Sequence, residues 1–276
     1  LEVAIVIGAD PLTLLASVVW APQGIDKLAV AGGLRQEPVK LVKARTVDLE
    51  VPAEAEMVIE GRILPGVREE EGPFGESTGY YFTYKNPVIE VTALTMRHDP
   101  VYQALLPWTL DEETLVDMAF GVKALQDLRR LVPGIRDLHF VPGTCGSHAV
   151  VAVEGLNPAQ VREALLQTLL INPQVKMAIA VDPDVNIYDL AEVHWAMATR
   201  LQAHQDTMIL PGMQGSSIDP SAESTPGPVW MSSKIILDAT RGPGEPGKFT
   251  RITPSSEAMV KAGEIWHNLV AGQGGR

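Results

Sequence analysis

The chain has 276 residues, of which 46% are hydrophobic and 20% charged, a composition typical of a globular protein with a substantial core. Its formal net charge of −12 excludes a broad nucleic-acid surface, because phosphate binding needs clustered Lys and Arg. The single cysteine, Cys145, excludes an intramolecular disulfide and a cysteine-based metal site. Its GTCGS context favours a small buried residue in a turn over a nucleophile, since nothing nearby marks an activating base.

The first 21 residues are apolar, but they lack a basic leader and are interrupted by Asp10 and Pro11, so they are not a signal peptide. No apolar run reaches the length of a membrane span. A cytoplasmic location is therefore expected. The segment predicts a strand over residues 4–8, a turn and a short helix. Because the sequence opens almost directly on a buried-strand pattern, we expect further sequence to precede it, in the same polypeptide or in another chain.

Residues 35–107 are rich in predicted strands. Apolar and polar residues alternate through several short runs, with turns at Pro52, at Pro65-Gly66 and at Asn86-Pro87. A series of short strands of this kind favours a barrel or a closed sheet.

A helix is predicted from Thr109 to about Arg130, because Thr109 and Glu112 form a capping-box pattern ahead of an apolar helical stripe. From about residue 135, strands alternate with helices: IRDLHFV and HAVVAVE are predicted strands, and NPAQVREALLQTL is a predicted helix opened by Asn157 and Pro158. Residues 211–229 and 241–256 are predicted loops. A last helix follows residue 255. The predicted fold is mixed α/β, with a β-rich, split-barrel-like region followed by a smaller α/β domain. The expected boundaries are 1–108 for the β-rich catalytic-loop region, 109–134 for a connecting helix, and 135–276 for the α/β domain with its tail helix.

The least ordinary segment runs from Glu69 to Tyr81. Glu69 and Glu70 fit a solvated turn, whereas Glu71 and Glu76 bracket a stretch punctuated by glycine and proline. A spacing of five places two side chains on opposite faces of a regular strand, so we expect a tight turn to bring these carboxylates together. Converging carboxylates repel each other, which favours a proton donor near neutral pH. The residues alone leave a catalytic and a structural role equally open.

Other candidates are weaker. Asp182, Asp184 and Asn186 resemble the start of a calcium loop, but no glycine turn or distal glutamate follows, so a structural acidic turn is favoured. The six histidines show no close pair with metal-ligand spacing. Lys176 and Lys234 are candidate phosphate contacts, although a lone lysine entering a strand is more often a solvated end.

The acidic segment also carries a family resemblance. EGPFGE followed by STGYY resembles the signature of the UbiD family of prenylated-FMN-dependent decarboxylases, and three further stretches resemble that family in the expected order. These stretches are VAGGLRQEPVKLVKARTVDLEVPAEAEMVIEG, VDPDVNIYDLAEVHWAMATR and SSKIILDAT. Four ordered matches are far more specific than one glycine-rich loop.

The resemblance implies that Glu76 is the proton donor that quenches the carbanion equivalent after carbon dioxide leaves, and that Glu71 supports it. It also implies prenylated FMN as the electron sink, with an arginine beside the glutamates and with Mn²⁺ and K⁺ at the flavin phosphate. In the family, the arginine and two metal ligands lie in an upstream segment that these residues do not contain. Lys27 stands at the position of the third metal ligand, where an ammonium cannot ligate a metal. We therefore predict no metal-ligating residue. Lys27 and Lys234 are the predicted contacts of the flavin phosphate, and a surface role for Lys27 stays open.

Two interpretations follow from the resemblance. One is a reversible, non-oxidative decarboxylase of an aromatic or α,β-unsaturated acid, completed by an N-terminal portion or by a companion subunit. The other is a non-catalytic UbiD-like assembly subunit. In both cases we expect a homo-oligomer, because the tail helix carries Met259, Ile265, Trp266 and Leu269 with few partners of its own.

Overall fold

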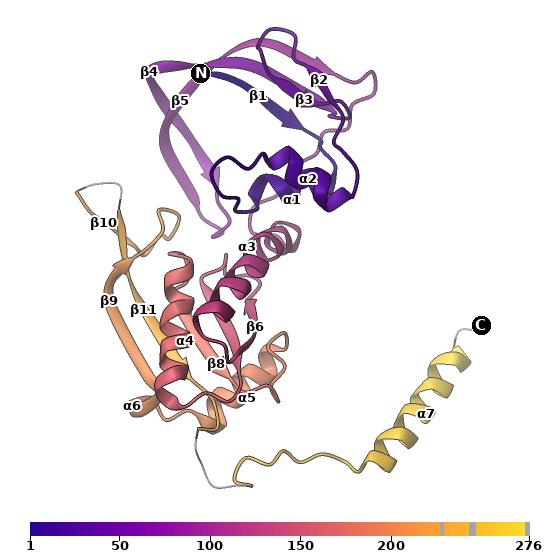
Figure 1. Cartoon of the computed structure of the whole chain (residues 1–276), viewed down its shortest axis with the longest axis vertical. Helices are drawn as coiled ribbons and strands as arrows, with labels where there is room; N and C mark the ends of the chain where they lie inside the picture. Colours follow the sequence, from indigo (N-terminus) through magenta and orange to yellow (C-terminus); the bar gives the residue numbers. More distant parts are fainter. Residues whose placement is uncertain (227–228, 243–246, 274–276) are drawn as a thin grey trace. The chain divides into compact units, whose positions relative to one another are not determined.

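The computed structural model describes residues 1–226, 229–242 and 247–273. These residues form two compact units, Leu1–Thr240 and Arg241–Arg276. The helices, labelled in Figure 1, are α1 (Pro11–Val18), α2 (Lys27–Arg35), α3 (Leu110–Leu131), α4 (Pro158–Ile171), α5 (Leu190–Arg200), α6 (Ala203–Asp206) and α7 (Ser256–Gln273). The strands are β1 (Glu2–Ile7), β2 (Leu41–Lys43), β3 (Glu50–Pro52), β4 (Met57–Gly75), β5 (Tyr81–Met96), β6 (Ile135–Phe140), β7 (His148–Val153), β8 (Met177–Val181), β9 (Thr207–Gln214), β10 (Glu223–Ser224) and β11 (Trp230–Asp238).

The first part of the chain is built around β4 and β5, which form a long antiparallel ribbon, drawn in purple in Figure 1. Strand β1 adds to the other edge of β4, giving a three-stranded sheet in the order β1-β4-β5, while β2 and β3 pair separately. Glu60 of β4 is only 1% exposed, and its carboxylate accepts hydrogen bonds from the backbone N–H groups of Arg45 and Thr46 and from the Thr46 hydroxyl. These bonds fix the loop after β2 onto the sheet, and they hold the pKa of Glu60 below its ordinary value.

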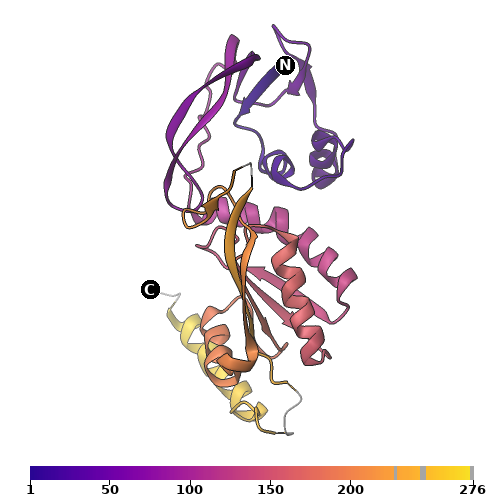
Figure 2. The ribbon, with the colours of Figure 1, turned by 90° about the vertical axis from the view of Figure 1, so that its left-hand side faces the viewer.

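The second part is a six-stranded sheet in the order β10-β11-β8-β7-β6, with β9 also paired to β11. Strands β7, β8 and β11 are parallel, and the others join them antiparallel. Both faces are covered, by α3 and α4 on one side and by α5 on the other (Figure 2). In β7 the two faces alternate, because Ala149, Val151 and Val153 meet α3 and α4 while Val150 and Ala152 meet the α5 side. Burial on both faces explains the nearly continuous apolar sequence of this strand.

The mixed α/β class is confirmed, with β-rich structure first and the α/β unit second. Helix α4 begins as predicted, since Asn157 caps it through a reciprocal capping box with Gln160 and Pro158 stands at its first turn. The domain boundaries at 108/109 and 134/135 stay predictions.

Several local predictions were wrong. The predicted turns at Pro65-Gly66 and Asn86-Pro87 lie inside the long strands β4 and β5, where they coincide with irregular pairing or an exposed strand segment and not with a chain reversal. Thr109 precedes α3 without a side-chain capping bond, because its hydroxyl donates to Leu106 O and Glu112 accepts from Trp108 N instead. The predicted loop at 211–229 contains the end of β9 and all of β10 in its described residues. The stretch from Glu71 to Gly75 belongs to β4 and is no tight turn.

Helix α7 has the expected extent, and its apolar side chains are exposed, including Trp266 at 69%. Among the described residues, no helix is both long and apolar enough to cross a membrane.

Candidate active site

An irregularity in the β4–β5 ribbon aligns the two predicted catalytic acids. Glu71 lies opposite Tyr84 and Phe74 lies opposite Phe82, so two residues of β4, Gly72 and Pro73, face one residue of β5. This is a β-bulge, which inserts one extra residue into a strand. A regular strand would put positions 71 and 76 on opposite faces, but the extra residue shifts the alternation by one and returns both to the same face.

The hydrogen bonds beyond the bulge agree with this alignment. Glu76 N donates to Tyr80 O at 3.0 Å, which places Glu76 opposite Tyr80, four residues from Tyr84 on the partner strand. Tyr80 and Tyr84 share a face because side chains alternate with a period of two. Phe82 lies between them on that face, and its ring stacks on Tyr84 with centroids 6.1 Å apart. Glu71 and Glu76 therefore flank a short row of aromatic side chains.

Each acid has its own surroundings. The Glu71 carboxylate is exposed and accepts a hydrogen bond from the Asn86 side-chain amide. Glu76 is half-buried, and its charge contributes, after burial, to raising the pKa of the Tyr84 phenol. Thr78 Oγ1 is buried and has no hydrogen-bond partner within the described structure, whereas the buried Tyr84 hydroxyl lies beside the Glu76 carboxylate. A buried polar atom without a partner, such as Thr78 Oγ1, is available to a ligand.

The turn after Glu76 is held from outside by Trp108. A Cβ placed on Gly79, whose φ is +81°, would approach the Trp108 ring to 3.2 Å, so glycine permits both the turn and the close packing. Trp108 in turn donates from its indole nitrogen to Gly143 O at 3.5 Å. This contact links the turn that carries Glu76 to the loop after β6.

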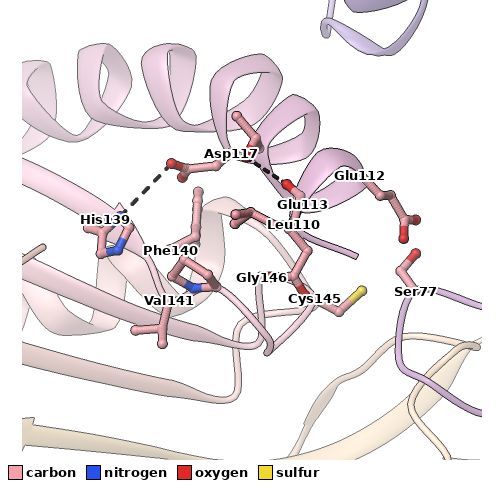
Figure 3. Close-up of a pocket in the computed structure, with 12 residues that line it drawn as sticks. Ser77, Leu110, Glu112, Glu113, Asp117, His139, Phe140, Val141, Cys145 and Gly146 are labelled. Carbon is pink, nitrogen blue, oxygen red and sulfur yellow. Dashed lines mark hydrogen bonds and ion pairs between the residues drawn. The ribbon is translucent and has the colours of Figure 1, made fainter. Parts of the chain in front are cut away.

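Beyond that link lies a cavity of about 220 Å³ (Figure 3). Ser77, the residue after Glu76, forms part of its wall, with the remaining wall supplied by α3, by β6 and by the loop after β6. Its charged or titratable lining residues are Glu112, Glu113, Asp117, His139 and Cys145.

Several polar atoms that line this cavity are buried without a hydrogen-bond partner in the described structure. His139 Nδ1 lies 3.9 Å from Asp117 Oδ2, drawn as a dashed line in Figure 3. Burial lowers the pKa of His139, although the charge of Asp117 opposes this, and burial raises the pKa of Asp117. Glu113 accepts from Gly143 N with one carboxylate oxygen, while its other oxygen is buried without a partner in the described structure.

Cys145 is buried, as expected. Burial raises the pKa of its thiol, and the charges of Glu112, Glu113 and Glu76 raise it further. A thiol held protonated in this way is a poor nucleophile, in keeping with the prediction from its sequence context.

The two lysines assigned to the cofactor lie in different settings. Lys27 is exposed at the first turn of α2, and its ammonium donates to Ser17 O at 2.6 Å. Lys234 of β11 is only 3% exposed, and its ammonium donates to Leu169 O and Pro173 O. Lys234 is therefore no solvated strand end, which corrects that expectation. Its contact with a flavin phosphate stays a prediction.

The acidic turn after β8 has a structural partner that the sequence pattern did not reveal. The buried guanidinium of Arg200 donates to Asp182 at 2.9 Å and to Asp184 at 2.8 Å. In the described part of the chain, no group of three His, Cys, Asp or Glu side chains is arranged to hold a metal ion.

Sequence reasoning missed Asp117 and His139 as members of a site. Each lies inside a correctly predicted element, Asp117 on the helix and His139 on the strand. A titratable residue within an apolar element was the available signal, but which two such residues meet depends on the packing of α3 on β6.

Models of known protein families match both parts of this chain. Residues 1–109 match the model of the 3-octaprenyl-4-hydroxybenzoate carboxy-lyase Rift-related domain, UbiD, and residues 114–239 match the model of the C-terminal domain of the same enzyme family. The chain belongs to the UbiD family.

Relatives within the UbiD family include decarboxylases with different substrates. The anhydromevalonate phosphate decarboxylase of Methanothermobacter thermautotrophicus is 35% identical over 257 residues, which are 92% of this chain and 60% of the relative. The UbiD-class enzyme HmfF from Pelotomaculum thermopropionicum, solved in complex with FMN, is 40% identical with a TM-score of 0.88, covering 95% of this chain and 59% of that one. The 3,4-dihydroxybenzoic acid decarboxylase from Enterobacter cloacae is 30% identical with a TM-score of 0.84, covering 96% and 58%. The chain thus spans somewhat more than half the length of these relatives.

Proposed function

We propose that this chain is the part of a UbiD-type carboxy-lyase that carries the acid pair, and that the protein decarboxylates an aromatic or α,β-unsaturated acid reversibly and without oxidation. The observation that carries the proposal is the bulge at Gly72 and Pro73, which turns Glu71 and Glu76 to one face of the ribbon. Both acids can then face one bound substrate, although a regular strand would point them apart. The decarboxylases among the relatives support the same reaction class.

In this proposal Glu76 holds the proton that replaces the departing carboxylate on the substrate carbon. Its half-buried position keeps it near the stacked Phe82 and Tyr84 rings, a surface suited to a flat unsaturated acid. Glu71, held by the Asn86 amide, lies on the same face and is proposed to support Glu76.

Prenylated FMN is the proposed cofactor, and it would supply an electron sink for the charge left by carbon dioxide. Lys27 fits a phosphate oxygen, because an ammonium donates hydrogen bonds and carries positive charge. It does not fit Mn²⁺ or K⁺, since it has no lone pair to offer a cation. We therefore assign no metal to Lys27.

The remaining parts of a complete site are proposed to come from outside these 276 residues, as an N-terminal portion or a companion subunit. The relatives are longer, and the arginine and metal ligands implied by the resemblance have no counterparts here. The isolated 276-residue chain is then expected to release no carbon dioxide with prenylated FMN, and addition of the portion that relatives carry should restore flavin binding. Robust turnover by the isolated chain would contradict this requirement.

A second candidate is a non-catalytic UbiD-like assembly subunit. The observation that favours it is Lys27, which stands where the family has a metal ligand and already donates to Ser17 O. The flavin absorbance spectrum of the purified complete protein separates the two candidates. Bound flavin together with carbon dioxide release supports the enzyme, whereas absence of both supports the assembly subunit.

Self-association through α7 is also proposed. The helix exposes Met259, Ile265, Trp266 and Leu269, each more than half accessible. An exposed apolar face of this kind is typical of subunit contacts. Sedimentation of the complete protein with and without Trp266→Glu tests this, and an unchanged oligomer would contradict it.

A further inference from the structure

Tyr84 of β5 lies on the same face of the ribbon as the two candidate catalytic acids. It is the cross-strand partner of Glu71, and side chains directly opposite each other in an antiparallel pair project to one face. Its ring stacks on Phe82, with an angle of 7° between the ring planes, and its hydroxyl lies beside the Glu76 carboxylate. One side chain therefore reaches from the position of Glu71 to the carboxylate of Glu76.

The surroundings of the Tyr84 hydroxyl keep its proton in place. The hydroxyl oxygen is buried. Burial raises the pKa of the phenol, and the charge of Glu76 and a hydrogen bond to its carboxylate raise the pKa further. A phenol of this kind is neutral near neutral pH, so it has a proton to donate to a carboxylate. Any further part of the protein that covers the ribbon adds to this burial and leaves the contact in place.

Glu76 lies where the strand no longer fixes a side chain. It follows Gly75, the last residue of β4, and precedes the turn that contains Gly79. A glutamate has several rotatable side-chain bonds, so its carboxylate samples many positions unless a partner selects one. A proton donor must lie within hydrogen-bond reach of the reacting atom, and a displacement of about 1 Å can cost roughly a hundredfold in rate. The acid therefore needs a restraint that the backbone does not supply.

We propose that Tyr84 is a positioning residue, whose phenol donates a hydrogen bond to the Glu76 carboxylate and fixes that carboxylate on the face shared with Glu71. This inference rests on the proposed function, because it assigns a partner to the acid that delivers the proton there. Tyr84 itself exchanges no proton with the substrate. When Glu76 is protonated, the same contact persists with the phenol oxygen as the acceptor, since a hydroxyl both donates and accepts.

The alternative role for Tyr84 is packing alone, through its ring on Phe82. The two roles differ in the hydroxyl, because Tyr84→Phe keeps the ring and its stacking and removes only the oxygen. Tyr81→Phe is the matched control. It removes the same atom from the same strand, but Tyr81 projects to the opposite face of the ribbon and is 78% exposed.

The first measurement is the steady-state rate of carbon dioxide release by the complete flavin-loaded protein. We expect Tyr84→Phe to lower kcat about tenfold or more, with KM, the flavin absorbance and the thermal unfolding midpoint close to those of the wild type. This pattern follows because a misplaced proton donor slows the chemical step and leaves binding unchanged. Tyr81→Phe should keep the wild-type kcat. An unchanged kcat in Tyr84→Phe, or equal losses in the two variants, would overturn the inference.

The second measurement needs no turnover. Tyrosinate absorbs in the ultraviolet, and the titration of Tyr84 is the part of the wild-type curve that is lost in Tyr84→Phe. In Glu76→Gln the phenol loses its negative neighbour, so the pKa of Tyr84 is expected to fall relative to the wild type. Glu70→Gln is the control, because Glu70 pairs with Lys85 on the other face and should leave this pKa unchanged.

The two measurements separate failure of the inference from failure of the proposed function. Equal pKa values of Tyr84 in the wild type and in Glu76→Gln would show that the two groups do not interact, and would overturn the inference whatever the turnover. A lowered pKa in Glu76→Gln, together with a wild type that releases no carbon dioxide, would support the contact and count against the proposed function.

Discussion

The β4–β5 ribbon and the six-stranded sheet use β-structure in opposite ways. In the sheet, β7 and β8 are covered on both faces, and residues such as Val150 and Ile179 have no exposed surface. In the ribbon, side chains of β5 alternate between exposed and half-buried, and Tyr81 is 78% exposed. The sheet is regular at its centre, whereas the ribbon is interrupted by three register shifts.

This difference indicates that the six-stranded sheet supplies most of the stability and that the β4–β5 ribbon positions the candidate catalytic acids. Burial specifies the sheet, because an apolar strand covered on both faces has few alternatives. Register specifies the candidate active site, because a single extra residue decides which acids share a face. The burial of the sheet does not depend on the exact spacing of residues, whereas the register of the ribbon depends on it entirely.

Core substitutions should therefore have the largest effect on stability. Ile179→Ala, in the centre of β8, is expected to lower the free energy of unfolding by about 2–5 kcal/mol, through lost burial and a residual cavity. Leu94→Ala in β5, where the side chain is 55% exposed, should cost less than about 1 kcal/mol. Urea unfolding of both variants measures this contrast. Similar losses for the two would show that the ribbon is as tightly packed as the sheet.

Removal of the bulge should spare stability and abolish activity. Insertion of one residue after Thr83 gives Gly72 and Pro73 one partner each on β5, so β4 alternates regularly and Glu76 turns to the face opposite Glu71. Carbon dioxide release by the complete flavin-loaded protein is expected to fall about a hundredfold or more, because the proton donor is misplaced. The thermal unfolding midpoint serves as the control for folding. Wild-type turnover in the insertion variant would refute the role of the bulge.

A smaller effect on stability is expected from the buried ammonium of Lys234 in the six-stranded sheet. Burial, assisted by Lys176, lowers the pKa of Lys234 from 10.5 to about 8. The unfolded chain keeps this proton up to its ordinary pKa, so between pH 8 and pH 10.5 it binds more protons than the folded chain. The stability of the wild type should therefore rise with pH across that window relative to Lys234→Met, which cannot titrate. Urea midpoints at several pH values measure the difference, and parallel curves for the two proteins would contradict the lowered pKa.

The sequence predicted those parts of the molecule that depend on local patterns. The apolar run of β7, the Asn157 cap of α4 and the helical stripe of α3 each appear where periodicity placed them. The Thr109 capping box failed because Glu112 has a competing donor, Trp108 N, one residue earlier.

Features that depend on pairing could not be predicted. The bulge is invisible in β4 alone, because an extra residue exists only relative to β5. Arg200 lies well along the chain from the aspartates that it binds, and Asp117 meets His139 only through helix–sheet packing. The glycine and proline residues between Glu71 and Glu76 marked these acids as candidates, the family resemblance implied their roles, and the ribbon shows why they share a face.

The central claim is that Glu76 delivers the proton in a UbiD-type decarboxylation. The most direct measurement is the rate of carbon dioxide release by the complete flavin-loaded protein carrying Glu76→Gln, with the flavin absorbance recorded on the same sample. Glu70→Gln is the matched control, since Glu70 pairs with Lys85 on the other face of the ribbon. The account predicts loss of about a hundredfold or more for Glu76→Gln with flavin still bound, and near-normal turnover for Glu70→Gln. Undiminished turnover by Glu76→Gln, or an equal loss in both variants, would contradict it.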